Sequence, residues 1–140
     1  MTASDDRGDL GAGSAGTVLA VCAGREKGRP KRRVGQAQLV RNFGLSGDCD
    51  AGPGGGRLTL LSQERRPAPS PGDPGAGHGS LGENLVVGGL DLASLPPGSR
   101  LRCGDALLSL LGEAPEGGGL FLAGVVLAGI VTEGDVIRPE

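Results

Sequence analysis

Short apolar runs between glycine-rich turns dominate the hydrophobic pattern of the chain. Residues 17–23 (TVLAVCA), 57–62 (RLTLLS) and 106–111 (ALLSLL) are rich in Val and Leu, and glycine stands beside each of them. Short apolar runs with such boundaries are typical of β-strands. Residues 34–42 (VGQAQLVRN) alternate partly between apolar and polar side chains and predict a further strand.

The later part of the chain adds a hairpin. Residues 100–103 and 106–111 flank the pair Gly104-Asp105, which is typical of a hairpin turn. Residues 85–87 predict a strand fragment, and residues 90–95 predict a short helical turn that ends at the following prolines.

One apolar stretch is ambiguous. Residues 120–131 (LFLAGVVLAGIV) fit either a buried helix or strands, because Gly124 and Gly129 interrupt both patterns. Several short strands between glycine turns, with little helix, nevertheless favour a mainly β protein, folded as a small β-barrel or a sandwich.

Two segments predict no regular structure. Residues 1–15 are small, acidic and polar, and we expect a flexible N-terminal lead-in there. Residues 67–79 contain four prolines and four glycines, which predicts a long loop because prolines lack the amide donor that a helix needs. Residues 16–138 are then expected to form one domain.

Composition narrows the classes of function. Glycine (29 of 140 residues) and proline (10) are abundant, but Leu, Ile, Val and Phe still make up about a quarter of the chain, which allows a packed core. With two Phe, no Tyr and no Trp, the chain has no aromatic platform for stacking single-stranded bases. A pI of about 5.4 gives no general basic footprint, so a nucleic-acid partner is not expected.

The pattern also predicts where the protein works. No apolar stretch reaches the length of a membrane span, and the N-terminal residues lack the basic and apolar regions of a signal peptide. We therefore expect a cytoplasmic protein that has no membrane partner.

Familiar catalytic motifs are missing from the sequence. It contains no GxSxG elbow, P-loop or HExxH motif, and its single histidine, His78, lies in the predicted loop, where a solvated side chain is expected. The basic stretch 25–33 (REKGRPKRR) is open to two interpretations. It is either a solvated charged connection or a phosphate contact, since guanidinium groups match phosphate oxygens.

Three cysteines offer candidate thiols. Cys22 and Cys103 lie in apolar runs and are predicted as small core residues. Cys49 stands between Asp48 and Asp50, whose charges are expected to raise its pKa and make it a poor thiolate. An odd count, no CxxC motif and a single histidine predict free thiols and no metal site.

The adjacent pair Glu83 and Asn84 precedes an apolar run. A carboxylate beside an amide at the start of a strand offers both hydrogen-bond acceptors and donors. Two interpretations stay open for this pair: it pins the preceding loop, or it recognises a ligand.

Taken in order, several short motifs resemble the MOSC domain family, the C-terminal module of molybdenum cofactor sulfurases. The matching pieces run from residue 16 to residue 137, and the most specific of them is the GENL stretch at 82–85, together with Gly134-Asp135 near the end. The others include Gly16-Thr17-Val18, Pro30-Lys31, Gly44-Leu45-Ser46-Gly47-Asp48, Arg57-Leu58-Thr59-Leu60-Leu61, Glu64 and Gly89-Leu90-Asp91-Leu92.

This resemblance implies a MOSC-type fold, that is, a small closed or partly open β-barrel. It also implies binding of molybdenum cofactor (molybdopterin) or a related small anionic ligand, and a role in sulfur handling or cofactor-dependent reduction, with a protein partner in cofactor maturation. The cofactor-binding residues that the resemblance implies are Lys31, Asp48, Arg57, Glu83 and Asn84.

The chain departs from the family pattern in one interval. Family members carry a cysteine between the strand that matches 106–111 and the closing glycine, whereas residues 112–118 (GEAPEGG) contain none. Unless another thiol has taken over, the usual sulfur transfer is impossible. Cys49 is the candidate catalytic residue for such a replacement.

Three hypotheses follow from the sequence. The leading one is a binding protein for molybdenum cofactor or a similar anionic ligand. The second is an enzyme, a sulfurtransferase or reductase that uses Cys49. The third is a non-catalytic module that docks a partner protein through its Leu- and Val-rich end. Whether the protein is an enzyme stays open at this point.

Overall fold

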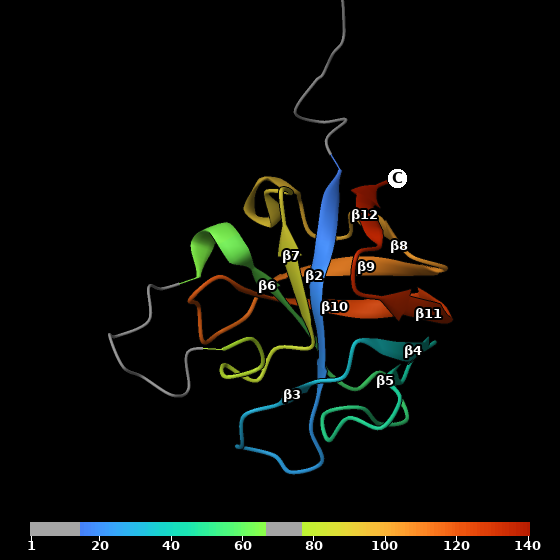
Figure 1. Cartoon of the computed structure of the whole chain (residues 1–140). Helices are drawn as coiled ribbons and strands as arrows, with labels where there is room; N and C mark the ends of the chain where they lie inside the picture. The colour runs from blue at the N-terminus through green and yellow to red at the C-terminus, as the bar shows by residue number, and fades with distance from the viewer. Residues whose placement is uncertain (1–14, 67–76) are drawn as a thin grey trace, which may run out of the picture.

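The computed structural model describes residues 15–66 and 77–140 of the chain (Figure 1). The predicted lead-in 1–15, apart from Ala15, and residues 67–76 of the predicted loop lie outside these described residues. No helix of the described part is long and apolar enough to cross a membrane.

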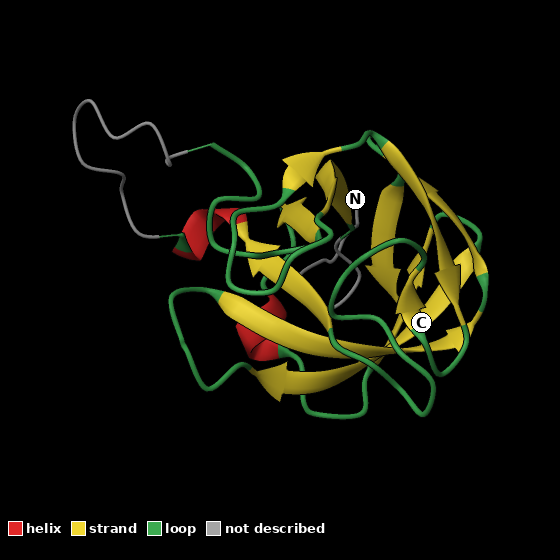
Figure 2. Cartoon of the chain, turned by 90° about the horizontal axis from the view of Figure 1, so that it is seen from below, coloured by secondary structure: helices red, strands yellow, loops and turns green. Residues whose placement is uncertain are grey.

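Seven strands form a closed barrel (Figures 1 and 2). Their spatial order is β12-β8-β9-β10-β6-β7-β2, and the additional pairing of β12 with β2 closes the ring. The strands are β2 (Gly16–Ala23), β6 (Leu58–Ser62), β7 (Leu85–Gly88), β8 (Arg100–Cys103), β9 (Ala106–Glu113), β10 (Leu120–Leu127) and β12 (Val136–Pro139). The predicted mainly β barrel is confirmed.

Smaller elements cover the barrel. Strands β4 (Gln36–Val40), β5 (Gly44–Leu45) and β11 (Gly129–Thr132) form a separate three-stranded sheet, and the short β3 (Arg32–Arg33) pairs with the end of β2. Two 3-10 helices, η2 (Gln63–Arg65) and η3 (Leu92–Ser94), follow β6 and β7. Figure 2, seen from below, shows loops across the lower end of the barrel.

The barrel interior is filled by aliphatic side chains. All five residues of β6 are buried, and leucines such as Leu60, Leu85 and Leu108 have no exposed surface. Each buried leucine contributes roughly 1.5–3 kcal/mol relative to an exposed one. Cys103 belongs to the main core cluster and Cys22 to a second, smaller buried cluster, which confirms their prediction as core residues.

The ambiguous stretch 120–131 forms two strands rather than a helix. β10 and β11 meet at Ala128, after a register irregularity between Val125 and Leu127 in the pairing of β10 with β9. A Cβ atom added to Gly129 would lie 2.4 Å from the carbonyl carbon of Asp105, so this glycine permits a close approach of two backbones. The same glycine that obscured the sequence pattern therefore marks a strand contact.

Two smaller predictions are also confirmed. The β8–β9 hairpin turns at Gly104, which has a positive φ of 57°. The short helical turn predicted within 90–95 is the 3-10 helix η3, and the Asp91 carboxylate accepts a hydrogen bond from the Ala93 amide (3.2 Å) at its start.

Candidate functional site

A cavity of about 450 Å³ opens at the lower end of the barrel, where loops from distant parts of the sequence meet. Its wall combines the connection between β2 and β3, the loop before β6, the loop before β7 and the loop between β9 and β10. A volume of this size falls within the range of small-molecule sites. Three sequence-predicted residues, Lys31, Cys49 and Arg57, lie in the wall.

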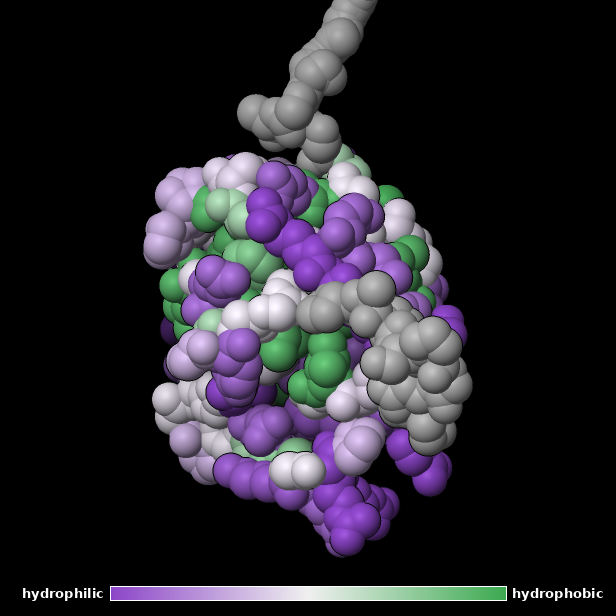
Figure 3. Space-filling view, turned by 90° about the vertical axis from the view of Figure 1, so that its left-hand side faces the viewer, coloured by the Kyte–Doolittle hydropathy of each residue, from purple (hydrophilic) through white to green (hydrophobic). Residues whose placement is uncertain are grey.

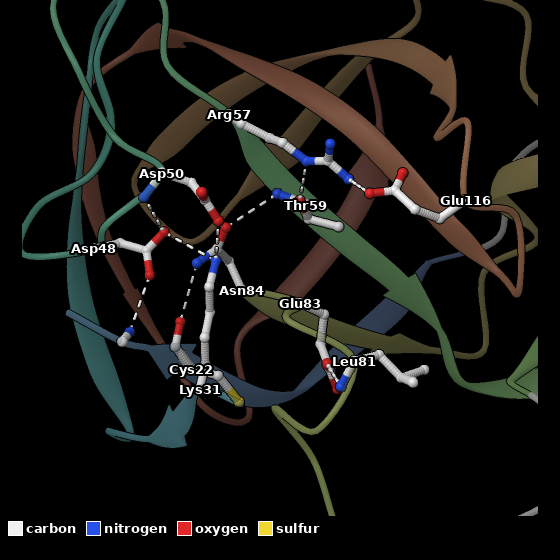
Figure 4. Close-up of polar contacts among 11 residues, drawn as sticks. Cys22, Lys31, Asp48, Asp50, Arg57, Thr59, Leu81, Glu83, Asn84 and Glu116 are labelled. Atoms are coloured by element: carbon white, nitrogen blue, oxygen red, sulfur yellow. Dashed lines mark hydrogen bonds and ion pairs between the residues drawn. The ribbon is translucent and has the colours of Figure 1, made fainter. Parts of the chain in front are cut away.

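Lys31 is a buried cation held by two carboxylates (Figure 4). Its Nζ lies 3.0 Å from Oδ2 of Asp48 and 2.8 Å from Oδ2 of Asp50, and the side chains of Lys31 and Asp48 are 2% and 0% exposed. Two of the three ammonium protons are therefore donated within the protein. Removing one partner of such a buried pair leaves an uncompensated charge, which is costly.

Asp48 also organises the backbone around this pair. Its Oδ1 accepts a hydrogen bond from the Gly24 amide (3.0 Å), and its Oδ2 accepts one from the Asp50 amide (3.2 Å). The carboxylate thus joins the end of β2 to the turn that carries Cys49. In the glycine-aspartate turn predicted at residues 44–48, the aspartate therefore serves to make this connection.

Arg57 is an accessible cation of the cavity. Its Nη2 lies 2.5 Å from Oε2 of Glu116, and its Nε donates to Oγ1 of Thr59 (3.3 Å). The side chains of Arg57 and Glu116 are 37% and 51% exposed. A hydrogen bond from its own backbone and one from Arg57 lower the pKa of Glu116. Since water screens this pair, an incoming anion can compete with the Glu116 carboxylate for the guanidinium.

Glu83 is fully buried and anchors one wall of the cavity. Its two carboxylate oxygens accept hydrogen bonds from the amides of Gly79 (2.7 Å) and Leu81 (3.0 Å). The loop that it holds supplies Ser80, Leu81 and Gly82 to the cavity wall. Glu83 therefore shapes the cavity by holding this loop, although its own side chain does not line the cavity.

Asn84 joins two strands beneath the cavity. Its Oδ1 accepts from the Thr59 amide (3.1 Å) and its Nδ2 donates to the Cys22 carbonyl (3.2 Å). Its own backbone adds hydrogen bonds to the same two residues, at 2.9 Å and 2.6 Å. Because Asn84 is fully buried and its amide is engaged in this way, it ties β2 to β6 and fixes Thr59 in the wall. For Glu83, the structure supplies the loop-pinning contacts that the sequence left as one of two interpretations. The contacts of Asn84 join two strands instead.

Cys49 is the half-buried thiol of the chain and lies in the cavity wall. Its amide donates to the Gly24 carbonyl (2.7 Å), which fixes its backbone. Burial raises the pKa of the Cys49 thiol, the charges of Asp50 and Asp48 raise it further, and Lys31 lowers it. The direction predicted from the sequence is the observed one, but desolvation is a larger cause than the flanking carboxylates.

The other two thiols are in the core. Burial, followed by the charge of Glu83, raises the pKa of Cys22 to about 12. Burial, followed by the charge of Asp135, raises that of Cys103 to about 12. Neither thiol is suited to ionise near neutral pH.

Asp48, Cys49 and Asp50 bring three potential metal ligands within 4.8 Å of one another. The ammonium of Lys31 already contacts both carboxylates and compensates one of their two charges. The arrangement is that of an ion-pair network.

Sequence reasoning missed several residues of the site. Glu116 stands in the shortened interval 112–118, so the departure from the family pattern pointed to the segment although not to the residue. Leu81 and Thr59 gave no signal, because an apolar loop residue and a strand threonine are common. His78 is not in the cavity wall, and its Nε2 lies 3.2 Å from Oε1 of Gln63.

No protein-family model and no curated protein matches the sequence. Among solved structures, the YuaD protein from Bacillus subtilis is similar with a TM-score of 0.69 and 18% identity, covering 88% of this chain and 94% of that one. YiiM from Geobacillus stearothermophilus has a TM-score of 0.63 and 14% identity, covering 89% of this chain and 75% of that one. YiiM from Escherichia coli has a TM-score of 0.60 and 16% identity, covering 89% of this chain and 69% of that one.

At these identities the likeness concerns the fold. The chain is a small β-barrel protein with a loop-walled cavity at one end. More particularly, its barrel resembles those of the YuaD and YiiM structures.

Proposed function

We propose that the chain is a MOSC-domain protein that binds molybdenum cofactor, or a related small anionic ligand, in the cavity beside Arg57. One observation carries this proposal. The six residues selected from the sequence come from four separate places in the chain, yet all of them either line this cavity or hold a residue that does.

The donor set fits an anionic ligand at one end of the cavity. A guanidinium has five N–H donors, and the hydrogen bonds of Arg57 to Thr59 and Glu116 leave others for phosphate oxygens. Arg29 adds a second exposed guanidinium to the wall. Lys31 already donates two of its three ammonium protons to carboxylates, so its role is to hold the turn that carries Cys49.

The cofactor would bring a phosphate group and a sulfur-coordinated molybdenum to this cavity. Arg57 and Arg29 would hold the phosphate. Leu81 and Pro30, which are apolar and lie in the wall, would contact the pterin ring system. Glu83, Asn84 and Asp48 would maintain the geometry of the wall without touching the ligand.

Anaerobic equilibrium dialysis with isolated molybdenum cofactor tests the proposal, with bound cofactor quantified by the fluorescence of its oxidised pterin. The parent protein should bind, and Arg57→Ala should raise the Kd at least about tenfold, since a hydrogen bond to a charged group contributes about 1.5–3 kcal/mol. The matched control is Arg138→Ala, which removes an exposed arginine of β12 at the opposite end of the barrel. No binding by the parent protein refutes the proposal.

A second candidate function is sulfur carriage by Cys49. The observation that favours it is the place of the half-buried Cys49 thiol in the wall of the same cavity, while the other two thiols are in the core. In this reaction the Cys49 thiolate attacks the terminal sulfur of a donor persulfide. A new Sγ–S bond forms, the S–S bond of the donor breaks, and the donor leaves as a thiolate.

The second candidate is tested by incubation with cysteine polysulfide, alkylation of the products and peptide mass spectrometry. One added sulfur is expected on Cys49, none on Cys22 or Cys103 in the folded protein, and none after Cys49→Ser. If Cys49 stays unmodified, or if all three cysteines react alike, sulfur carriage by this residue is excluded.

A further inference from the structure

The basic segment, residues 25–33, has no part in the function proposed above apart from Arg29, Pro30 and Lys31. It leaves β2 and returns through β3, and both of its ends are fixed. The Gly24 carbonyl accepts from the Cys49 amide (2.7 Å), and the Lys31 amide donates to the Gly79 carbonyl (2.8 Å). All residues from 25 to 30 are exposed, so an anchored loop presents its cations to solvent.

This loop has two faces, and each borders a cavity. Arg29 and Pro30 lie in the wall of the cavity beside Arg57 and also in the wall of a second cavity of about 580 Å³. The second cavity is lined by Arg25, Arg29 and Arg32, with Glu26 as the carboxylate in its wall. Figure 3 shows that hydrophilic residues gather at this lower end of the molecule.

The cations of the second cavity are only weakly neutralised. Glu26 pairs with Arg29 (3.0 Å), but the two side chains are 69% and 73% exposed, so solvent screens the pair. Within the described residues, Arg25 and Arg32 have no ion-pair partner. Arg33, by contrast, is committed to Glu133 through Nε (2.8 Å) and Nη2 (3.0 Å). Arg33 is thus held within the fold, whereas the guanidinium groups around the second cavity exceed the negative charge that neutralises them.

We infer that this second cavity is a binding site for a diphosphate group. Guanidinium groups form paired hydrogen bonds with phosphoryl oxygens, and three of them around one cavity can engage both phosphoryl groups of a diphosphate. The exposed Val34 and Pro30 give the same cavity an apolar side, which suits the remainder of a nucleotide. The diphosphate belongs either to a nucleotide or to free pyrophosphate.

Isothermal titration of the full chain with pyrophosphate, ADP and orthophosphate tests this inference. Pyrophosphate and ADP should bind, orthophosphate should bind at least about tenfold more weakly, and Arg25→Ala/Arg32→Ala should raise the Kd at least about tenfold. Tighter binding of ADP than of pyrophosphate identifies a nucleotide, whereas equal binding identifies the diphosphate group alone. Both substituted residues are exposed, so the double variant is expected to fold.

Two control variants separate this site from the first cavity. Arg138→Ala should leave diphosphate binding unchanged, and so should Arg57→Ala. If Arg57→Ala abolishes binding while Arg25→Ala/Arg32→Ala does not, the diphosphate occupies the first cavity and the inference is overturned, although the proposed function gains support. Equal binding of orthophosphate and pyrophosphate, or no binding of either diphosphate, also overturns it.

Discussion

Among the three cations of the first cavity, Lys31 and Arg57 differ most clearly in what surrounds them. Lys31 is enclosed with Asp48 and Asp50, while Arg57 meets Glu116 at the surface. In the sequence the two look alike, since each is a basic residue near a strand. Their surroundings give them different tasks, because a buried charge must be paired by the fold and an exposed one can exchange partners.

The largest effect expected from this difference is on stability. Asp48→Ala removes one partner of the buried ammonium and two backbone hydrogen bonds, so the free energy of unfolding should fall by about 3–5 kcal/mol. Denaturant unfolding measures this change. Arg57→Ala is the control and should resemble Arg138→Ala. If Asp48→Ala and Arg57→Ala destabilise the protein equally, the distinction between the two cations is wrong.

A smaller loss of stability is expected at Glu83. Glu83→Gln keeps the volume but replaces one of two charged acceptors with an amide that donates, and the free energy of unfolding should fall by about 1–3 kcal/mol. The amides of residues 79–82 should also exchange hydrogen faster. Unchanged exchange in this loop would contradict the role of Glu83 as its anchor.

The sequence predicted local elements better than their assembly. The β8–β9 hairpin and β6 were predictable because turn residues and short apolar runs act over a few neighbouring positions. The parallel pairing of β6 with β7 and the closure of β12 onto β2 join residues far apart in the chain, so no local pattern encoded them. The barrel itself was expected because of the ordered motifs and their family resemblance.

The candidate site was predictable to a similar extent. The residues at its centre were selected from the sequence because they are basic, carry a thiol or form an adjacent acid–amide pair. Burial was not predictable, and burial decides which of them can touch a ligand. Lys31 and Asn84 are enclosed while Arg57 is open, a distinction that arises only after the loops have packed.

Substitution at Glu116 tests, through ligand binding, whether the exposed Arg57 can exchange its partner. Glu116→Gln removes the charge that competes for the Arg57 guanidinium, so anionic ligands of the first cavity should bind several-fold more tightly. The pKa of Glu116 is lowered in the folded protein, so its carboxylate stays charged at a pH below the ordinary pKa of a glutamate. The stability that this charge contributes is lost as the pH falls through the lowered pKa. Parent binding should therefore strengthen in the same acidic range, and Glu116→Gln should remove that dependence. A variant that binds more weakly than the parent would assign Glu116 to the ligand rather than to competition with it.

The smallest expected effect is on the reactivity of Cys49, which shares the cavity wall with Lys31 and Arg57. Burial and the two neighbouring carboxylates raise the pKa of the Cys49 thiol, so its alkylation by iodoacetamide should reach its full rate at a higher pH than that of an ordinary cysteine. Asp50→Asn should move the alkylation profile slightly toward lower pH, because desolvation, which the substitution leaves in place, is the largest cause. A large shift would mean that the charge of Asp50 dominates over burial. In that case the turn that carries Cys49 is more accessible to water than the buried Lys31–Asp48 pair beside it. The boundary between enclosed and exposed charge then lies deeper in the cavity.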